Sequence, residues 1–155
     1  MLRDRGQVVR QAAHPVEPAA FDRTRSRHTI RSDLALIADE HAVLSWQCRI
    51  LLEAVENGRP LGTLRRYIQG LLDAARNHFR SEERVMRATR FADADDHGAD
   101  HERLLRDAAG VLRRVDVDPL AVDWTRVCDD LGRQLSEHQS RQDRELEGHI
   151  RRLRA

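Results

Sequence analysis

The chain has 155 residues and a formal net charge of +1, so its length suits one domain with an adequate core. The near-neutral charge excludes a global attraction to nucleic acid or to a membrane surface. No apolar run approaches the ~20 residues that a membrane-spanning helix needs. Aromatic residues make up only 4% of the chain, and the apolar residues are mostly Leu, Val, Ala and Ile, which favours helices over sheet.

The first 32 residues differ from the rest of the chain. They hold two of the four prolines and seven arginines against three acidic residues, a net charge of +4 that leaves −3 for the remainder. We therefore expect a polar, Arg-containing arm over residues 1–32 and one domain over residues 33–155. The run RTRSRH within this arm leaves open a second interpretation, a docking strip for an acidic protein partner.

Cysteine usage and the amino-terminal residues predict a cytoplasmic protein. Cys48 and Cys128 match no metal-binding or redox spacing, and each falls in an apolar helical stripe. We interpret them as reduced core thiols in a reducing compartment. The amino terminus carries arginines without the apolar segment of a secretory signal.

Four amphipathic segments with short connections predict an all-α, up-down-up-down four-helix bundle behind the N-terminal arm. Ser32 or Asp33 can cap the first helix, and Asn57-Gly58 followed by Pro60 ends it. The second helix is expected from about Leu61 to Thr89. The third begins near the aspartates of residues 93–96, and Val117-Asp118-Pro119 breaks it. The fourth is expected over residues 119–153, with Pro119 in its first turn.

Polar residues interrupt the apolar stripe of every predicted helix. A single histidine in a stripe is most often a core residue with a satisfied hydrogen bond, but here all four helices contribute. Residues four apart share a helix face, which holds for His78 with Glu82 and for His97 with His101. Glu83 is rotated about 100° from Glu82 and is expected to lie outside the group. The group comprises His41, His78, Glu82, His97, His101, His138 and Asp143.

Five imidazoles and two carboxylates suit two metal ions with bridging carboxylates and one open position. Imidazole suits iron, copper, nickel and zinc, and mixed ligation in a helix bundle favours a di-iron centre. No glutamate is followed by a histidine three positions later, so the main signature of ferroxidase-like centres is missing. His138 and Asp143 point about 140° apart on an ideal helix; either a local π-type widening brings them together or the carboxylate reaches sideways.

The segment HFRSEERVMRATRFADADDHGADH at 78–101, with ADEH at 38–41 and H-x-x-x-x-D at 138–143, resembles the hemerythrin family, in particular bacterial HHE-type domains. The resemblance covers about residues 33–150. It implies that His97, His101 and His138 bind one iron and that His41 and His78 bind the other. Glu82 and Asp143 would bridge the two iron ions together with an oxo or hydroxo group, and the two-histidine iron would keep a position for dioxygen.

The chain departs from the family pattern around the implied dioxygen pocket. Phe91 stands where the family usually has Tyr, and Gln134 and Gln139 stand where it often has Trp and Ile. We expect Leu135 to cover the open position, whereas the two amides either turn into the pocket or face solvent. His14, His28 and His149 are expected to lie outside the centre.

The function implied by the resemblance is reversible dioxygen binding for storage, delivery or sensing, without enzymatic turnover. Two alternatives stay open. One is a di-iron enzyme that turns over peroxide or nitric oxide, and the other is a regulatory protein that binds a partner in response to iron or oxygen.

Overall fold

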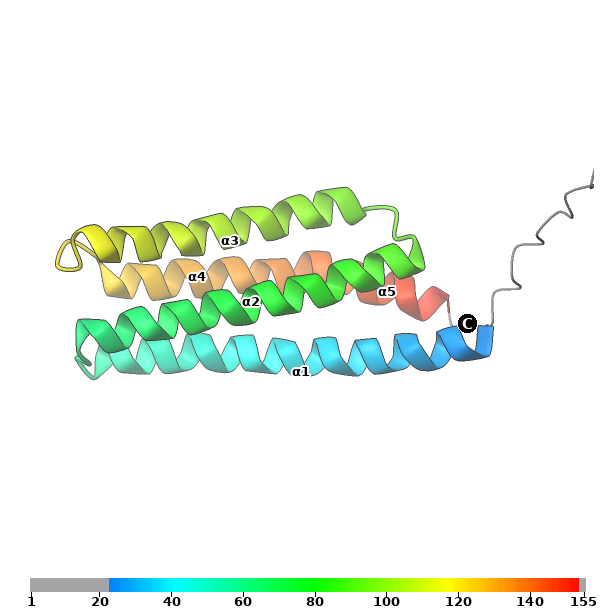
Figure 1. Ribbon diagram of the computed structural model, residues 1–155, viewed down its shortest axis with the longest axis horizontal. Helices are drawn as coiled ribbons and strands as arrows, with labels where there is room; N and C mark the ends of the chain where they lie inside the picture. Colours follow the sequence, from blue (N-terminus) through cyan, green and yellow to red (C-terminus); the bar gives the residue numbers. More distant parts are fainter. Residues whose placement is uncertain (1–22, 154–155) are drawn as a thin grey trace, which may run out of the picture.

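The computed structural model describes residues 23–153, which form an elongated bundle of antiparallel helices (Figure 1). The first three helices are α1 (Arg23–Glu56), α2 (Leu61–Thr89) and α3 (Ala94–Val117). The fourth segment consists of α4 (Trp124–His138), a π-helical turn η1 (Gln139–Asp143) and α5 (Arg144–Arg152). The described residues contain no strand, so the predicted all-α bundle is confirmed. Residues 1–22 of the predicted arm lie outside the described residues.

The first helix begins earlier than predicted. It starts at Arg23, so Ser32 and Asp33 lie inside it and neither caps its amino terminus. The physical reason is the absence of a helix breaker, because the last proline before this point is Pro18 and no glycine follows it until Gly58. Arginine is also a good helix former. The predicted stop is confirmed, since α1 ends at Glu56 and Gly58 takes a left-handed φ of 60°.

The predicted start of the fourth helix at Pro119 is wrong. Helix α4 begins at Trp124, where the side chain of Asp123 accepts a hydrogen bond from the backbone N–H of Arg126 at 3.1 Å. Pro119 instead lies in a turn closed by the Asp118 carboxylate, which accepts from the backbone N–H groups of Leu120 and Ala121. Aspartate side chains compete with helical hydrogen bonds in this way, and here a turn forms in place of the first helical turn.

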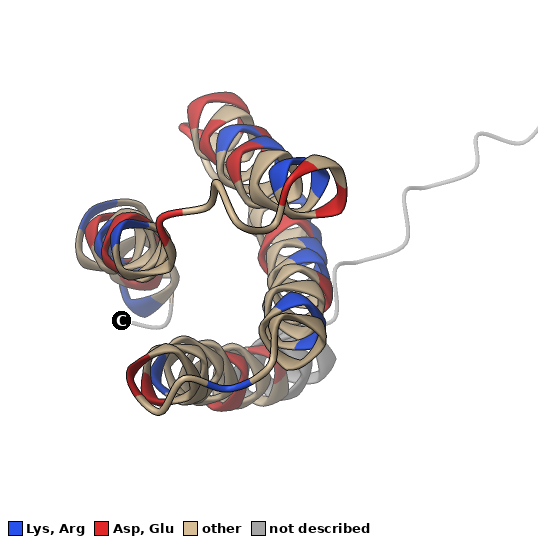
Figure 2. Cartoon of the chain, turned by 90° about the vertical axis from the view of Figure 1, so that its left-hand side faces the viewer, with Lys and Arg blue, Asp and Glu red and all other residues tan. Residues whose placement is uncertain are grey.

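The four segments surround one interior, and each of α1 and α3 packs against both α2 and α4 (Figure 2). Two apolar clusters fill opposite ends of this interior. One lies toward the α1–α2 loop and includes Leu51, Leu72 and Val127, and the other includes Ile37, Met86 and Ile150. On every helix the polar residues singled out by the sequence fall between these clusters. The bundle therefore contains one polar layer between two apolar clusters.

Both cysteines are free thiols, and burial raises the pKa of each to about 11. Cys128 belongs to the first apolar cluster, as its place in the helical stripe predicts. None of the described helices has the length and apolar character needed to cross a membrane.

Candidate metal centre

The seven predicted ligands converge in the polar layer. Six of them are buried, and the side chain of His41 retains 20% of its exposure. Burial of this many ionisable groups is costly unless they are paired or bind a metal. The sequence analysis therefore identified side chains that the fold brings to one place.

The donor atoms of these residues divide into two overlapping groups, within each of which all atoms lie within 4.8 Å of one another. We call them the three-histidine group and the two-histidine group. The first comprises His97, His101 and His138 with both carboxylates, and the second comprises His41 and His78 with the same carboxylates. Glu82 and Asp143 thus belong to both groups. The division matches the one that the family resemblance implies.

Asp143 spans the two groups with its two oxygens. Its Oδ1 lies 2.9 Å from His138 Nε2 and 3.2 Å from His97 Nε2. Its Oδ2 lies 2.9 Å from His41 Nε2. One carboxylate therefore faces histidines of both groups, which is the arrangement that a bridging ligand requires.

Glu82 reaches the same two groups from α2. Its Oε2 lies 3.1 Å from His101 Nε2 and 3.5 Å from His78 Nε2, while its Oε1 lies 3.9 Å from His41 Nε2. Glu82 comes from α2 and Asp143 from η1, so the two carboxylates approach the layer from different parts of the fold.

The π-helical turn η1 explains how Asp143 reaches the layer. Its hydrogen bonds run from i to i+5, so the five-residue interval from His138 to Asp143 closes roughly one turn. Both side chains consequently point inward, and both are buried at 2% relative exposure. The local widening that the sequence left as one of two solutions is confirmed.

A test of whether a cation fits this site comes from hydrogen bonding. Buried polar atoms normally have a partner. Among the described residues, several buried atoms of the layer that could ligate a metal make no well-directed hydrogen bond, although opposite charges lie nearby. These atoms are His78 Nε2, Glu82 Oε1, His97 Nε2, His138 Nε2 and Asp143 Oδ1. A metal ion satisfies such atoms, and neutral imidazole and carboxylate together suit iron. The residues present therefore fit the metal that the sequence analysis predicted.

The surroundings shift the pKa values of the ionisable groups in the layer in different directions. Burial alone lowers the pKa of His138, but the nearby carboxylates of Asp143 and Glu82 outweigh this effect and raise it to about 10. Burial likewise opposes ionisation of Asp143, yet the surrounding imidazoles hold its pKa well below the usual range. The pKa of His78 is lowered, because burial dominates there.

Three further carboxylates bind the outward-facing nitrogens of the histidines. The Nδ1 atoms of His78, His101 and His138 lie 3.4, 3.3 and 2.8 Å from carboxylate oxygens, which belong respectively to Glu40, Glu83 and Asp100. Ser81 donates to Glu40 at 2.9 Å, and Arg103 donates to Asp100 at 2.6 Å. Such partners fix the orientation of a metal-binding imidazole and raise its basicity.

Sequence reasoning missed these three carboxylates. Glu83 lies outside both donor groups, as expected, but its carboxylate contacts the Nδ1 of His101. Each of the three directly adjoins a predicted ligand in the sequence. A rotation of about 100° takes such a neighbour off the inner face but leaves it beside the adjacent helix. Adjacency to a ligand was the signal that could have found them.

Apolar contacts surround the three-histidine group. The ring of Phe79 stacks on His101 with centroids 4.0 Å apart and an interplanar angle of 10°. Phe91 is buried, and its ring meets His97 edge-on at 6.3 Å. His149 is half-buried rather than fully outside the bundle, and its Nε2 lies 3.0 Å from the Thr89 carbonyl oxygen, which ties α5 to the end of α2.

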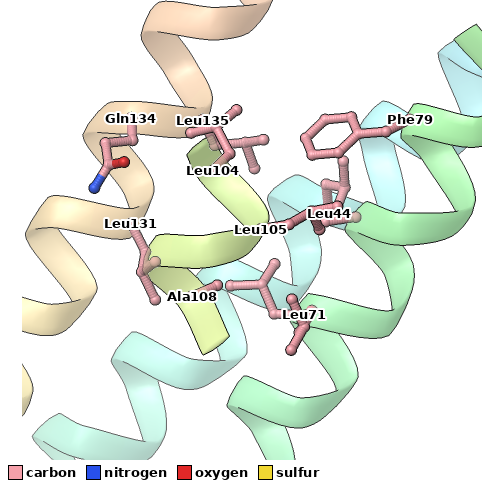
Figure 3. A pocket seen from close by; sticks show the side chains of 11 residues that line it. Leu44, Leu71, Phe79, Leu104, Leu105, Ala108, Leu131, Gln134 and Leu135 are labelled. Atoms are coloured by element: carbon pink, nitrogen blue, oxygen red, sulfur yellow. The ribbon is translucent and has the colours of Figure 1, made fainter. Parts of the chain in front are cut away.

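An apolar cavity of about 40 Å³ lies beside the polar layer, between the inner faces of all four helices (Figure 3). Its lining includes Leu44, Phe79, Leu104 and Leu135, each within one helical turn of a predicted ligand. Leu135 points toward the ring of Phe79 across this space, whereas the amide of Gln134 points away from that ring.

The two glutamines differ in their surroundings. The oxygen of Gln134 accepts a hydrogen bond from Arg103 at 3.0 Å, so this amide is held at the α3–α4 surface. The amide nitrogen of Gln139 is buried and has no hydrogen-bond partner among the described residues.

Comparison with known proteins supports these observations at the level of the family. The model of the hemerythrin HHE cation-binding domain matches residues 32–150. No curated protein and no solved structure matches the chain. The family match and the donor cluster together indicate that the protein binds iron. The chain belongs to the hemerythrin family, with an HHE cation-binding domain over residues 32–150.

Proposed function

We propose that this protein binds dioxygen reversibly at a two-iron centre built from the seven residues of the polar layer. His97, His101 and His138 would hold one iron and His41 and His78 the other, with the carboxylates of Glu82 and Asp143 available to both. The proposal rests above all on the two overlapping donor groups that share both carboxylates. A site for a single metal ion does not require two carboxylates that each belong to two donor groups.

When bound, ferrous iron supplies the electrons that reversible dioxygen binding requires. The protein contributes the positions of the donors and a restricted supply of water and protons. The two apolar clusters close both ends of the layer, and Phe79 shields His101. The three outer carboxylates hold His78, His101 and His138 in fixed orientations.

The apolar cavity supports a small gas as the ligand. A cavity needs only about 10–15 Å³ to hold one water-sized molecule, so about 40 Å³ accommodates a diatomic gas but not a larger substrate. Most of its lining is leucine, alanine and phenylalanine, which offer no hydrogen bond to a polar ligand. Dioxygen reaches the polar layer through this space, at the position where Leu135 faces Phe79.

The test combines metal analysis with optical spectroscopy of the full chain. We expect about two iron ions per chain, as in other two-metal carboxylate bundles, and a spectrum that changes and recovers over repeated cycles of oxygenation and deoxygenation. The exposed Glu102→Ala variant on α3 serves as a matched control and retains both properties. One zinc ion per chain, or a spectrum that dioxygen does not alter, would refute the proposal.

The enzymatic alternative is tested with the same material. Steady-state turnover of peroxide or nitric oxide by the iron-loaded protein, at rates that exceed dioxygen release, would assign the centre to catalysis instead.

A further inference from the structure

Helix α1 carries an exposed face that differs from the other outer surfaces of the bundle. Between residues 32 and 48, nine residues are exposed and only Asp39 among them is charged. Nine residues of α2 are also exposed, and six of those are charged. In a chain with 34% charged residues, this face lacks the composition of an ordinary solvated surface.

Large apolar side chains lie on this face at helical spacing. Leu36, Val43 and Trp46 are 42%, 46% and 48% exposed. Positions 36 and 43 lie within about 20° of each other around the helix axis, and position 46 lies about 60° further round. Together with the exposed residues Ala35, Asp39, Ala42 and Arg49 they form one continuous strip, which we call the α1 strip.

We propose that the α1 strip is the interface of a homodimer in which two copies of α1 pack antiparallel about a two-fold axis near residue 44. A two-fold interface must be complementary to itself, and this strip meets that condition in charge. The arrangement places Asp39 of one copy opposite the partner's Arg49. Both residues are exposed, and Arg49 forms only a long 3.7 Å pair with Glu53 in its own helix.

The strip is also complementary in size. The same axis sets the large Trp46 against the partner's small Ala42, and it brings the two copies of Val43 together at the centre. Large-against-small pairing lets two helices interdigitate. A buried tryptophan near the centre of an interface usually contributes much of the binding energy.

The length of the strip sets the expected strength of the dimer. Residues 36–49 span about 20 Å of helix, so the contact is smaller than the roughly 800 Å² per partner of a standard interface. We therefore expect a dimer with a dissociation constant on the order of micromolar. The metal layer faces the opposite side of α1, which makes the interface independent of the proposed dioxygen binding.

Sedimentation equilibrium of the full iron-loaded chain tests the proposal. The wild type should show a monomer–dimer equilibrium, and Val43→Arg should be monomeric throughout the range studied. Val117→Arg is the matched control, because Val117 is 86% exposed at the end of α3 and lies outside the strip; it should dimerise like the wild type. Helical circular dichroism and iron content verify that each variant is folded.

A charge exchange tests the antiparallel register. Asp39→Arg alone and Arg49→Asp alone should each weaken the dimer about tenfold, because like charges then face each other. The double variant restores the opposite pairing and should recover most of the affinity. Failure of the double variant to recover would overturn the register.

A wild type that stays monomeric would overturn the proposal, whatever else covers the strip. In that case, protection of Trp46 from acrylamide quenching would indicate coverage by residues 1–22 of the same chain. Free quenching would indicate an uncovered face.

Discussion

The two halves of the polar layer are built differently. The histidines of the three-histidine group lie on α3 and α4, and each of these imidazoles is at most 2% exposed. The histidines of the two-histidine group lie on α1 and α2, where the side chain of His41 keeps 20% of its exposure. The first group offers three imidazoles to a cation, whereas the second offers two and includes the partly exposed His41. Under the proposed function, the first half retains metal and the second half reacts with the gas.

The most disruptive change removes a residue that both halves share. Glu82→Ala should reduce the iron content from about two ions per chain to below about one, because neither group keeps its donor number. Elemental analysis after desalting measures this loss, with Glu102→Ala as the control. If the Glu82→Ala protein retained both ions, Asp143 alone would suffice as a bridge and the shared role of Glu82 would be refuted.

Removal of metal tests the layer as a whole. Without a cation, the buried donor atoms of both groups lose their partner, so the apo protein should be less stable than the loaded one. At free iron about 100-fold above the dissociation constant, binding adds about 2.7 kcal/mol and raises the melting temperature by about 5–10 °C. Calorimetric scans of both forms measure the shift. Equal midpoints would contradict the idea that the layer needs metal.

Substitutions of the carboxylates that contact histidine Nδ1 atoms should affect the two halves of the layer one at a time. Asp100→Ala removes the partner of His138, and Glu40→Ala removes the partner of His78. Each should weaken metal binding by about 10- to 100-fold, but at a different one of the two sites. Anaerobic iron titration resolves the two steps, and the exposed Asp107→Ala serves as the control. Equal weakening of both steps by each variant would show that the halves are not separately supported.

Much of this arrangement could be predicted from the sequence because helical periodicity fixes which side chains share a face. The bounds of α2 agree with the prediction, since Pro60 precedes this helix and the chain after Thr89 turns at a left-handed residue. The four-residue spacings of His78 with Glu82 and of His97 with His101 placed these side chains together because both pairs lie within regular α-helix.

The remaining features, which are helix ends and contacts between helices, depend on interactions that helical periodicity does not describe. Whether Pro119 begins a helix or lies in a turn was decided by the Asp118 carboxylate. The early start of α1 reflects the absence of a breaker rather than the presence of a cap. The pairing of Asp100 with His138 joins α3 to α4, and no spacing within one helix predicts a contact between helices.

The pH dependence of the apo protein follows from the raised pKa of His138. The pKa of a histidine is normally near 6.5, and the Asp143 and Glu82 carboxylates raise the pKa of His138 in the folded protein to about 10. Its contribution to stability is therefore complete below pH 6.5 and is lost as the pH rises toward 10. The depressed pKa values of Glu82 and Asp143 act at the other end, since their contribution is lost as the pH falls below about 4.

Metal binding should reverse this trend, because a coordinating imidazole must be neutral and binding releases its proton. The apo protein should become less stable between pH 6.5 and 9, while the gain in melting temperature on iron loading grows over the same range. Parallel anaerobic thermal scans of both forms at several pH values measure the two slopes. A gain that is independent of pH would show that His138 carries no proton in the apo protein.

The smallest expected effect distinguishes Gln134, which lines the cavity, from Gln139, which directly follows the predicted ligand His138. Gln134 is held by Arg103 at the surface, whereas the amide nitrogen of Gln139 is buried without a partner among the described residues. A buried, unpaired donor attracts water, and water beside the bound gas supplies protons that promote oxidative loss of the oxygenated form. Gln139→Ile should therefore slow the decay of the oxygenated spectrum by about 2- to 10-fold, the range that one hydrogen bond accounts for. Gln134→Trp should leave the decay nearly unchanged, because the native amide already points away from Phe79. A larger effect at Gln134 than at Gln139 would indicate that water reaches the pocket from the α3–α4 surface instead.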